Sequence, residues 1–517
     1  MLRLSAVTTA LLLCGCTFVQ PNVFTHNRGG DSFTSKVNVK PFYGCETAAY
    51  PPNNSDAVPH YTINLDLQPE QRWQQLVSDN KKQLLQLVGY VFNLTEELVG
   101  HEVFSFLLRN LGKLGSSLPE PYQQEMQGIA SASGLSMAEV TLYNIFYELI
   151  AFCTSIVVQD NAGRVYHGRN LDFGIFMGWN RSSHEWSVAE LLRPLVVDLT
   201  WSSGGETLYS SVNYVGYVGV ITAVKKGAFS FSLDQRFSWN GGFVGLLEWI
   251  LFDDHQQSWV AFLSRDVMEH AGSYEEAKQM LSSTRLIAPV YFILAGTQPR
   301  QGCVITRYRD GYDTVSLNSS SWFLVQTNYD HWKQPPIYDD RRTPAVTCLN
   351  KGRHLLLADA TDRYKRSIPT FGDNNNTRNM QHVNSVPSSR TDTGLQRKIK
   401  ILAYLKNNYF STDYENSGKI SAHHNNYEKS ASDKKHHLQS EVETMSRYFY
   451  DGTKGSSSST GRGDSSGGPE ASYSLLYNVL STRPVLNKLT TYTSLMSAED
   501  GTLKTWLRVC QDPCWPW

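Results

Sequence analysis

The strongest constraint on the fold is a predicted β-hairpin that begins close to Cys153. The residue period changes to two after Cys153, first over 155–159 and again over 164–168. The intervening Asp160-Asn161-Ala162-Gly163 has the composition of a hairpin turn. Because helical spacing precedes this point and strand-like runs follow it, we expect an α+β body in which helices pack on layered antiparallel sheets.

Further strand-like runs follow the hairpin and are separated in places by helices. A capping box of Ser273 and Glu276 predicts a helix over 274–281, and apolar spacing predicts another over 244–251. The expected strands are 217–224, 229–233, 290–295, 304–306, 314–317 and 322–327.

The region before Cys153, residues 21–152, is predicted to be mainly helical. A second capping box, Ser136 with Glu139, opens a helix that ends just short of Cys153. Apolar stripes of this kind either dock on a core or face a lipid surface, and we favour docking. The stripe is formed by Leu84, Leu87, Val88, Val91, Leu98, Val103, Phe104, Leu107, Leu108 and Leu111.

The first twenty residues have the features of a secretory signal and are set apart from the fold. Arg3 precedes a largely apolar run of about ten residues, which is too short to span a bilayer. A bacterial lipoprotein box that lipidates Cys16 is the alternative interpretation. Secretion also agrees with five expected glycosylation sites at Asn53, Asn93, Asn180, Asn318 and Asn375.

Composition changes abruptly after Asn350. Residues 352–470 are rich in Ser, Asn, Asp, Lys and His, and they bury too little apolar area to offset an ordering entropy of about 1 to 2 kcal/mol per residue. We therefore expect a mostly disordered insertion between the core regions 153–351 and 471–517. An adhesion role for its Arg462-Gly463-Asp464 is weakly supported, because Gly/Ser-rich linkers produce this tripeptide easily.

The charge balance argues against a nucleic-acid partner. The chain has 47 Lys and Arg residues against 48 Asp and Glu, for a formal net charge of −1. No broad basic surface is expected from this composition.

Six cysteines remain after the signal, and an oxidising compartment favours their pairing. Cys510 and Cys514 enclose three residues that permit a tight loop, which predicts a local disulfide, and Cys45 with Cys348 is the natural second pair. Cys303 lies in an apolar run and is expected to be a buried thiol. Since C-x-x-C spacing is absent and no second Cys/His pair lies at zinc spacing, we expect no metal site and no cofactor.

Cys153 carries the most distinctive chemistry. Arg169 and Asp172 follow it by sixteen and nineteen residues, across the predicted hairpin. If the chain were cut before Cys153, one residue would hold a thiol and an α-amine that takes the thiol proton. Arg169 would lower the pKa of that amine, and Asp172 would hold its ammonium form. The competing interpretation of Arg169 and Asp172 is a surface ion pair.

A family resemblance rests on the sequence around these residues. Cys153-Thr154-Ser155-Ile156-Val157 and the stretch 166–173, Tyr-His-Gly-Arg-Asn-Leu-Asp-Phe, resemble the nucleophile region of the acid ceramidase and N-acylethanolamine acid amidase family. These are N-terminal nucleophile hydrolases, related to bile salt hydrolases. The resemblance continues through 61–67, 239–242, 326–330, 339–344 and 483–488, and so covers nearly all of the chain outside the signal and the insertion.

The resemblance implies both a fold and a mechanism. The implied fold has layered antiparallel sheets flanked by helices, preceded by a helical α subunit. Autocleavage between Phe152 and Cys153 would separate that subunit from the catalytic β subunit, with Cys45–Cys348 joining the two and Cys510–Cys514 closing a loop. The implied site consists of Cys153 as nucleophile, Arg169 and Asp172 lining it, Asn328 donating to the oxyanion, and Arg341 in support.

The activity implied is hydrolysis of the N-acyl amide bond of ceramide, with fatty acid ethanolamides as the alternative substrates. Ceramide is favoured by the two cysteine pairs and by the stretches 237–242 and 510–514. The implied location is the lysosome, with secretion as a second destination. The implied partners are a lipid membrane or vesicle surface and a saposin-like activator.

The chain departs from the family pattern in two places. One is the long insertion, and the other is Gln235, which stands where an acidic residue is expected, with Asp234 displaced by one. A competing hypothesis from another class is a secreted lipid-binding or adhesive protein with a vestigial pocket. The complete set of expected site residues argues against that hypothesis.

Overall fold

The computed structural model describes residues 42, 44–53, 56–115, 118–146, 151–173, 178–236, 257–335, 340–352 and 469–514. The chain divides into two compact units, Met1–Asp359 with Pro469–Trp517 and Ala360–Gly468. All described residues belong to the first unit. The expected signal, nearly all of the expected insertion, the helix over 244–251 and Asn375 therefore lie outside the described residues.

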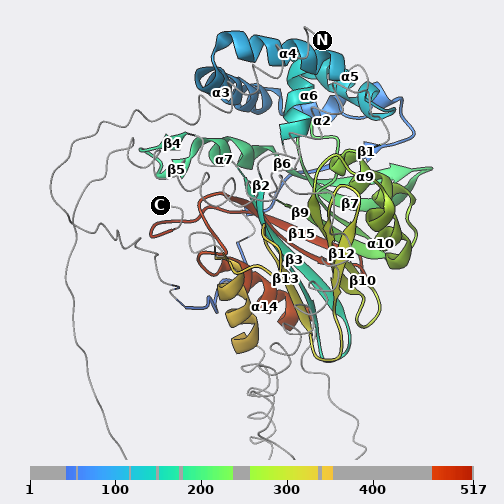
Figure 1. The fold of residues 1–517 in the computed structure, drawn as a ribbon, viewed down its shortest axis with the longest axis vertical. Helices are drawn as coiled ribbons and strands as arrows, with labels where there is room; N and C mark the ends of the chain where they lie inside the picture. Colours follow the sequence, from blue (N-terminus) through green and yellow to red (C-terminus); the bar gives the residue numbers. More distant parts are fainter. Residues whose placement is uncertain are drawn as a thin grey trace, which may run out of the picture. The chain divides into compact units, whose positions relative to one another are not determined.

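Two sheets form the centre of the first unit (Figure 1). The five-stranded sheet has the order β13-β2-β3-β14-β15, and the eight-stranded sheet has the order β1-β6-β7-β8-β9-β10-β11-β12. Every neighbouring pair is antiparallel except β1 with β6. The strands are β1 (His60–Asn64), β2 (Ala151–Gln159), β3 (Val165–Phe173), β6 (Val196–Ser203), β7 (Glu206–Tyr214), β8 (Thr222–Lys225), β9 (Phe229–Gln235), β10 (Val290–Gly296), β11 (Gly302–Arg307), β12 (Tyr312–Ser316), β13 (Phe323–Gln326), β14 (Thr490–Ser497) and β15 (Thr502–Leu507).

The two sheets pack face to face, and helices cover their outer faces. Val157 and Val165 of the smaller sheet share one buried cluster with Tyr291 and Ile293 of the larger sheet. Helix α14 (Pro469–Ser481) packs on the other face of β3, while α9 (Val260–His270) and α10 (Tyr274–Ser283) pack on the larger sheet. The α+β body of layered antiparallel sheets is therefore confirmed.

The hairpin that begins the smaller sheet has its predicted turn. Oδ1 of Asp160 accepts hydrogen bonds from the backbone nitrogens of Ala162 and Arg164, and Gly163 has a φ of +87°. A positive φ is easily adopted by glycine, which explains its place in the turn. Strand β2 begins at Ala151, so Cys153 lies inside a strand and not at its start as the sequence suggested.

The region before Cys153 packs on the core as expected. Leu84, Leu87, Val88 and Val91 of α3 are buried in the main cluster, which confirms docking for this helix. Trp73 also contacts Trp201 of β6 edge-to-face. The helices are α2 (Gln74–Asp79), α3 (Lys81–Val99), α4 (His101–Gly115), α5 (Tyr122–Ser133) and α6 (Met137–Phe146).

This region is less purely helical than its apolar spacing predicted, since β1 joins the edge of the larger sheet. A parallel pair requires a long connection, and sequence spacing alone does not reveal such a distant partner. Strands β6 and β7 were also missed. The run 217–224 was expected to be one strand, but residues 217–221 form an irregular loop and β8 begins only at Thr222.

A buried ion pair joins the region before Cys153 to the region after it. Glu125 of α5 contacts Nη1 and Nη2 of Arg265 on α9 at 2.5 and 2.7 Å. Arg72 and Trp73 also donate to the Glu125 carboxylate, at 2.8 and 2.7 Å. Both carboxylate oxygens are therefore paired, as a buried charge requires.

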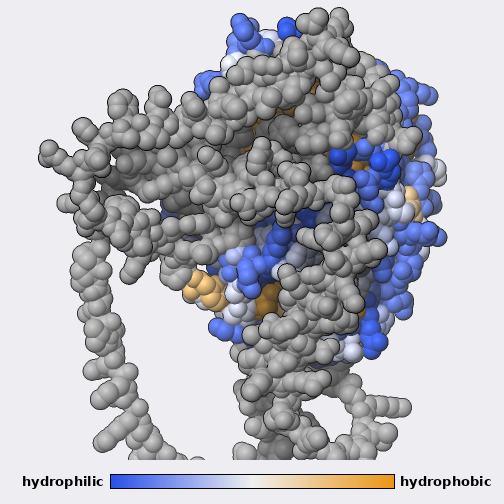
Figure 2. Space-filling view, viewed as in Figure 1, coloured by the Kyte–Doolittle hydropathy of each residue, from blue (hydrophilic) through white to orange (hydrophobic). Residues whose placement is uncertain are grey.

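None of the described helices is long and apolar enough to cross a membrane. In the view of Figure 2, hydrophilic residues dominate the described surface and apolar residues form small, separate patches.

Candidate active site

Cys153 lies in the middle of a buried polar site between the two sheets. Its side chain is fully buried, and it is the third residue of β2, paired in register with Leu171 of β3. Its Sγ accepts a hydrogen bond of 2.8 Å from Nη2 of Arg169. The structure thus brings together the thiol and the cation that the sequence predicted.

Arg169 is held in place by the larger sheet. Its Nη1 donates to the carbonyl oxygen of Ile221 and to Oγ1 of Thr222, both at 2.8 Å. Arg169 and Asp172 are both fully buried, so the interpretation of the two as a surface ion pair is wrong. A buried guanidinium with fixed acceptors is instead suited to stabilising negative charge on the sulfur.

Asn328 and Arg341 hold the backbone of Cys153. The Cys153 nitrogen donates to Oδ1 of Asn328 at 2.7 Å, and Nη1 of Arg341 donates to the Cys153 carbonyl at 2.9 Å. Nη2 of Arg341 donates to the same Asn328 oxygen at 2.8 Å. The Arg341 guanidinium also lies over the Phe152 ring, 5.6 Å from its centroid. Both sides of the predicted cleavage bond therefore contact Arg341.

Asp172 is part of the site but contacts its neighbours rather than Cys153. Its Oδ2 accepts from Arg341 and Asn487, each at 2.9 Å, and its Oδ1 accepts from Thr490 at 2.6 Å. In the uncut chain, Asp172 therefore orients Arg341, which in turn holds the backbone of Cys153. The sequence had placed its carboxylate directly on the amine.

Burial dominates the electrostatics of the thiol. It raises the pKa of Cys153 to about 12, although the nearby Arg169 opposes this effect. Burial also raises the pKa of Asp172, against the opposing effects of Arg341 and of the hydrogen bonds from Thr490 and Asn487. In the uncut chain Cys153 is therefore a neutral thiol.

A chain of buried polar residues behind the nucleophile escaped sequence reasoning. Ser155 donates to Oδ1 of Asp234 at 2.8 Å and contacts the Ser232 hydroxyl at 2.8 Å, and Ser232 in turn contacts Nε2 of His167 at 2.9 Å. Oδ1 of Asp234 lies 3.6 Å from Nη2 of Arg169. The available signal was the period of two in β9, which turns alternate side chains toward the other sheet.

The cysteine pairing is the expected one. Disulfides join Cys45 to Cys348 and Cys510 to Cys514, with Cα–Cα distances of 5.4 and 6.0 Å. Cys303 is a buried free thiol, as predicted. The first disulfide connects the region before Cys153 to the region after it.

Four of the five predicted glycosylation sites are in the described residues. Asn53, Asn93 and Asn318 are exposed, whereas Asn180 is half-buried and its amide contacts Glu190 at 3.3 Å. Glycosylation at these positions remains a prediction.

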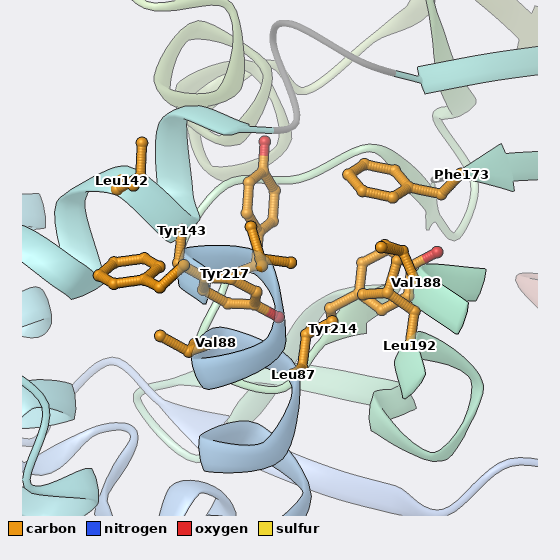
Figure 3. Close-up of a pocket in the computed structure, with 11 residues that line it drawn as sticks. Leu87, Val88, Leu142, Tyr143, Phe173, Val188, Leu192, Tyr214 and Tyr217 are labelled. Carbon is orange, nitrogen blue, oxygen red and sulfur yellow. The ribbon is translucent and has the colours of Figure 1, made fainter. Parts of the chain in front are cut away.

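An apolar cavity of about 30 Å³ lies at the end of β3, the strand that pairs with the nucleophile strand β2 (Figure 3). In Figure 3, Phe173, Val188 and Tyr214 face Tyr143 across the cavity. Phe173 directly follows Asp172 in β3. The full lining is Leu87, Val88, Val91 and Phe92 of α3, Leu142 and Tyr143 of α6, Phe173, Val188 and Leu192 of α7 (Ser187–Leu192), Tyr214 and Tyr217.

Comparison with known proteins places this site in a family. Residues 56–118 match the beta subunit of N-acylethanolamine-hydrolyzing acid amidase, and residues 153–350 match the linear amide C–N hydrolases of the choloylglycine hydrolase family. The acid ceramidase of Homo sapiens is 35% identical over 480 residues, which cover 92% of this chain and 92% of that protein. The chain belongs to the acid ceramidase family.

A second acid ceramidase agrees with this membership. The acid ceramidase of Mus musculus is 44% identical over 324 residues, which cover 61% of this chain and 82% of that protein. Among solved structures, a Caenorhabditis elegans N-acylethanolamine-hydrolyzing acid amidase ortholog is 24% identical, with a TM-score of 0.39, and covers 69% of this chain and 100% of its own. As a member of a family of linear amide hydrolases, the chain is an amidohydrolase, and the matched hydrolase region begins at Cys153.

Proposed function

We propose that the chain cuts itself between Phe152 and Cys153 and then hydrolyses the N-acyl amide bond of ceramide to sphingosine and a fatty acid. The observation that carries the proposal is the placement of Arg169 Nη2 2.8 Å from Cys153 Sγ while Asn328 holds the Cys153 nitrogen. The Arg169 guanidinium thus donates to the nucleophilic sulfur, and the Asn328 amide holds the Cys153 nitrogen, which becomes the base after cleavage.

Self-cleavage begins when the Cys153 sulfur attacks the Phe152 carbonyl carbon. A carbon–sulfur bond forms, the carbon–nitrogen bond breaks, and the Cys153 nitrogen takes up a proton as it becomes an amine. Water then hydrolyses the thioester, which leaves a Phe152 carboxylate and a free thiol. Arg341 contacts the Phe152 ring and the Cys153 carbonyl, so it holds the strand straight across this bond.

In the cut enzyme, the amine of Cys153 takes the thiol proton and the thiolate attacks the substrate amide. The leaving sphingosine amine receives that proton, and water releases the fatty acid from the acyl-enzyme. Arg169 stabilises the thiolate, and Asn328 fixes the direction of the amine lone pair. The Asn328 amide nitrogen donates to the Gln235 carbonyl at 2.8 Å in the uncut chain, so its proposed oxyanion role requires that contact to be exchanged for the substrate.

The apolar cavity supports a fatty acyl substrate. At about 30 Å³ it is too small for a long acyl chain in the uncut chain. Its walls come from α3 and α6, before the cleavage bond, and from β3, α7 and β7, after it. A small shift of these two groups relative to each other after cleavage would open the space along Phe173 toward the nucleophile. The substrate would be supplied by a lysosomal membrane or vesicle and a saposin-like activator.

A fatty acid ethanolamide is the second candidate substrate, because residues 56–118 match a subunit of N-acylethanolamine-hydrolyzing acid amidase. The relatives that span 92% of the chain favour ceramide. A non-catalytic lipid-binding protein has no need for the buried contacts among Cys153, Arg169, Asn328 and Arg341.

The test has two steps. N-terminal sequencing of the purified, acid-incubated protein should show a fragment that begins at Cys153, and Cys153→Ala should stay uncut. The cut protein is then incubated with short-chain ceramide and with palmitoylethanolamide in parallel. Faster release of fatty acid from ceramide supports the proposal, faster release from the ethanolamide selects the second candidate, and no release from either contradicts both.

A further inference from the structure

Asp234 and the nucleophile both approach the same guanidinium nitrogen of Arg169. Nη2 of Arg169 is 2.8 Å from Cys153 Sγ and 3.6 Å from Asp234 Oδ1. Because the same nitrogen faces both groups, the sulfur and the carboxylate compete for one positive charge. Asp234 is fully buried, so little solvent screens this competition.

The position of Asp234 follows from the strand period. In β9, Asp234 is buried between the sheets, whereas the adjacent Gln235, at the position where the family resemblance implied an acidic residue, is only half-buried. Because successive residues of a strand face opposite sides, a one-residue displacement of the acid puts the carboxylate on the face of β9 that also carries Ser232 and contacts Ser155. Ser155, two residues after Cys153 on β2, donates to Asp234 and fixes its carboxylate.

Several titratable or charged groups surround Asp234. Within the described residues, its Oδ2 has no hydrogen-bond partner. Strand β3 contributes Arg169, Asp172 and His167, the last through the Ser232 hydroxyl. The other groups are Cys153 of β2, Tyr291, which is paired with Asp234 on β10, and Arg341. Among the described residues, Arg169 is the cation that lies within ion-pair distance of Asp234, at 3.6 Å.

We propose that Asp234 is a positioning residue that holds Arg169 against Cys153 and, by gaining or losing its proton, sets how much of the Arg169 charge is available to the sulfur. Protonated Asp234 leaves the whole charge to the sulfur and favours the thiolate. Ionised Asp234 neutralises part of that charge and disfavours the thiolate. The inference rests on the proposed nucleophile role of Cys153 and adds an acid-dependent control of it.

The pKa of Asp234 lies between the pH of an acidic compartment and a slightly alkaline pH. Burial raises the pKa of Asp234 to about 7, against the opposing effect of Arg169. Asp234 is therefore protonated in an acidic compartment and mostly ionised above neutral pH. The nucleophile is supported at acid pH and restrained along a neutral secretory route.

The test compares Asp234→Asn with the native protein and with a matched control. Asp198→Asn is the control, because Asp198 is a half-buried aspartate of the larger sheet whose pKa burial also raises to about 7, and the other group that shifts this pKa is Thr505 and not Arg169. Alkylation of Cys153 by iodoacetamide is followed by mass spectrometry of its peptide at pH 5 and pH 8. Asp234→Asn should alkylate about 3- to 10-fold faster than the native protein at pH 8 and within about twofold of it at pH 5, an effect of the size that one nearby charge has on a thiol pKa.

The control should follow the native protein at both pH values. An equal pH 8 to pH 5 ratio in all three proteins, or a loss of reactivity in Asp234→Asn at both pH values, overturns the inference. Ceramide hydrolysis is assayed in the same samples. If ceramide is not hydrolysed but the pH 8 to pH 5 alkylation ratio of Asp234→Asn differs from that of the native protein, the proposed function is rejected and the role of Asp234 is kept. If ceramide is hydrolysed normally but this ratio is unchanged, the proposed function is kept and the role of Asp234 is rejected.

Discussion

Oδ1 of Asn328 lies 2.7 Å from the backbone nitrogen of Cys153 and accepts its hydrogen bond. In the uncut chain this nitrogen is a peptide N–H, and after cleavage it would be the α-amine that serves as the base. Arg341 donates to the same oxygen, which fixes the orientation of the Asn328 amide. The base is therefore held in position before it exists as an amine.

We expect Asn328→Ala to slow self-cleavage by about 10²-fold or more, the usual effect of removing one positioned polar group at a reacting centre. The loss should come mainly from misplacement of the Cys153 nitrogen and of Arg341. A time course of fragment appearance on a denaturing gel at acid pH measures it. Asn318→Ala, on an exposed loop, is the control and should be cut at the native rate, while rapid cleavage of Asn328→Ala would contradict the proposed role.

Arg341 and Asp172 form a buried ion pair in which each residue depends on the other. Nη1 of Arg341 is 2.9 Å from Oδ2 of Asp172, with exposed side-chain fractions of 1% and 0%. Arg341→Met should lower the free energy of unfolding by about 3 to 5 kcal/mol, because a buried carboxylate loses its counter-charge. Chemical denaturation measures the change.

A double-mutant cycle separates the pair from its surroundings. Arg341→Met with Asp172→Asn removes both charges, so it should be more stable than Arg341→Met alone. Additive losses would show that the two side chains do not interact. Neither variant should cut itself, since Arg341 also holds Phe152 and Cys153.

Local sequence signals predicted the parts of this site that lie close together in the chain. The hairpin turn at Asp160 and the period of two correctly brought Cys153, Arg169 and Asp172 to adjacent strands. Asn328 and Arg341 were found only through the family resemblance, because no local pattern reports contacts across about 175 or more residues.

The features that sequence reasoning did not predict depend on contacts between segments that are distant in the chain. Asp234 was noted as a displaced acid, but only the packing of β9 against β2 shows that it approaches Arg169. Strand β1 was missed for a similar reason, since its partner β6 lies more than 130 residues away. Strand pairing over such separations depends on tertiary packing and not on local propensity.

The Glu125–Arg265 pair should keep the two chains together after cleavage without the Cys45–Cys348 disulfide. Both side chains are fully buried, and they lie on opposite sides of the cleavage bond in sequence. After cleavage and reduction, the two fragments should still elute as one species in size-exclusion chromatography at neutral pH. Under the same conditions Glu125→Ala should separate into fragments, because it leaves Arg265 buried without its partner. Glu139→Ala, whose carboxylate only caps a helix, is the control.

Asp234 and His167 stand at the two ends of one buried chain of hydroxyl groups, and their effects on stability oppose each other. Burial raises the pKa of Asp234 from 3.8 to about 7, so between these values the folded chain binds a proton that the unfolded chain lacks, and this contribution to stability is lost as the pH rises toward 7. Burial, followed by the Arg169 charge, lowers the pKa of His167 from 6.5 to about 3, so this contribution is lost as the pH falls below 6.5. Between about pH 4 and 6.5, the two nearly cancel.

In the two single variants, the unfolding free energy should therefore change with pH in opposite directions. Relative to the native protein, Asp234→Asn keeps only the His167 effect and should gain about 1.4 kcal/mol of unfolding free energy per pH unit from pH 4 to 6.5, while His167→Asn should lose the same amount. Urea unfolding at four pH values in this range measures both slopes, and the double variant should be parallel to the native protein. A zero slope in one single variant would mean that the group left in that variant does not change its protonation on folding, and the hydroxyl chain would then join only one titrating residue to Arg169.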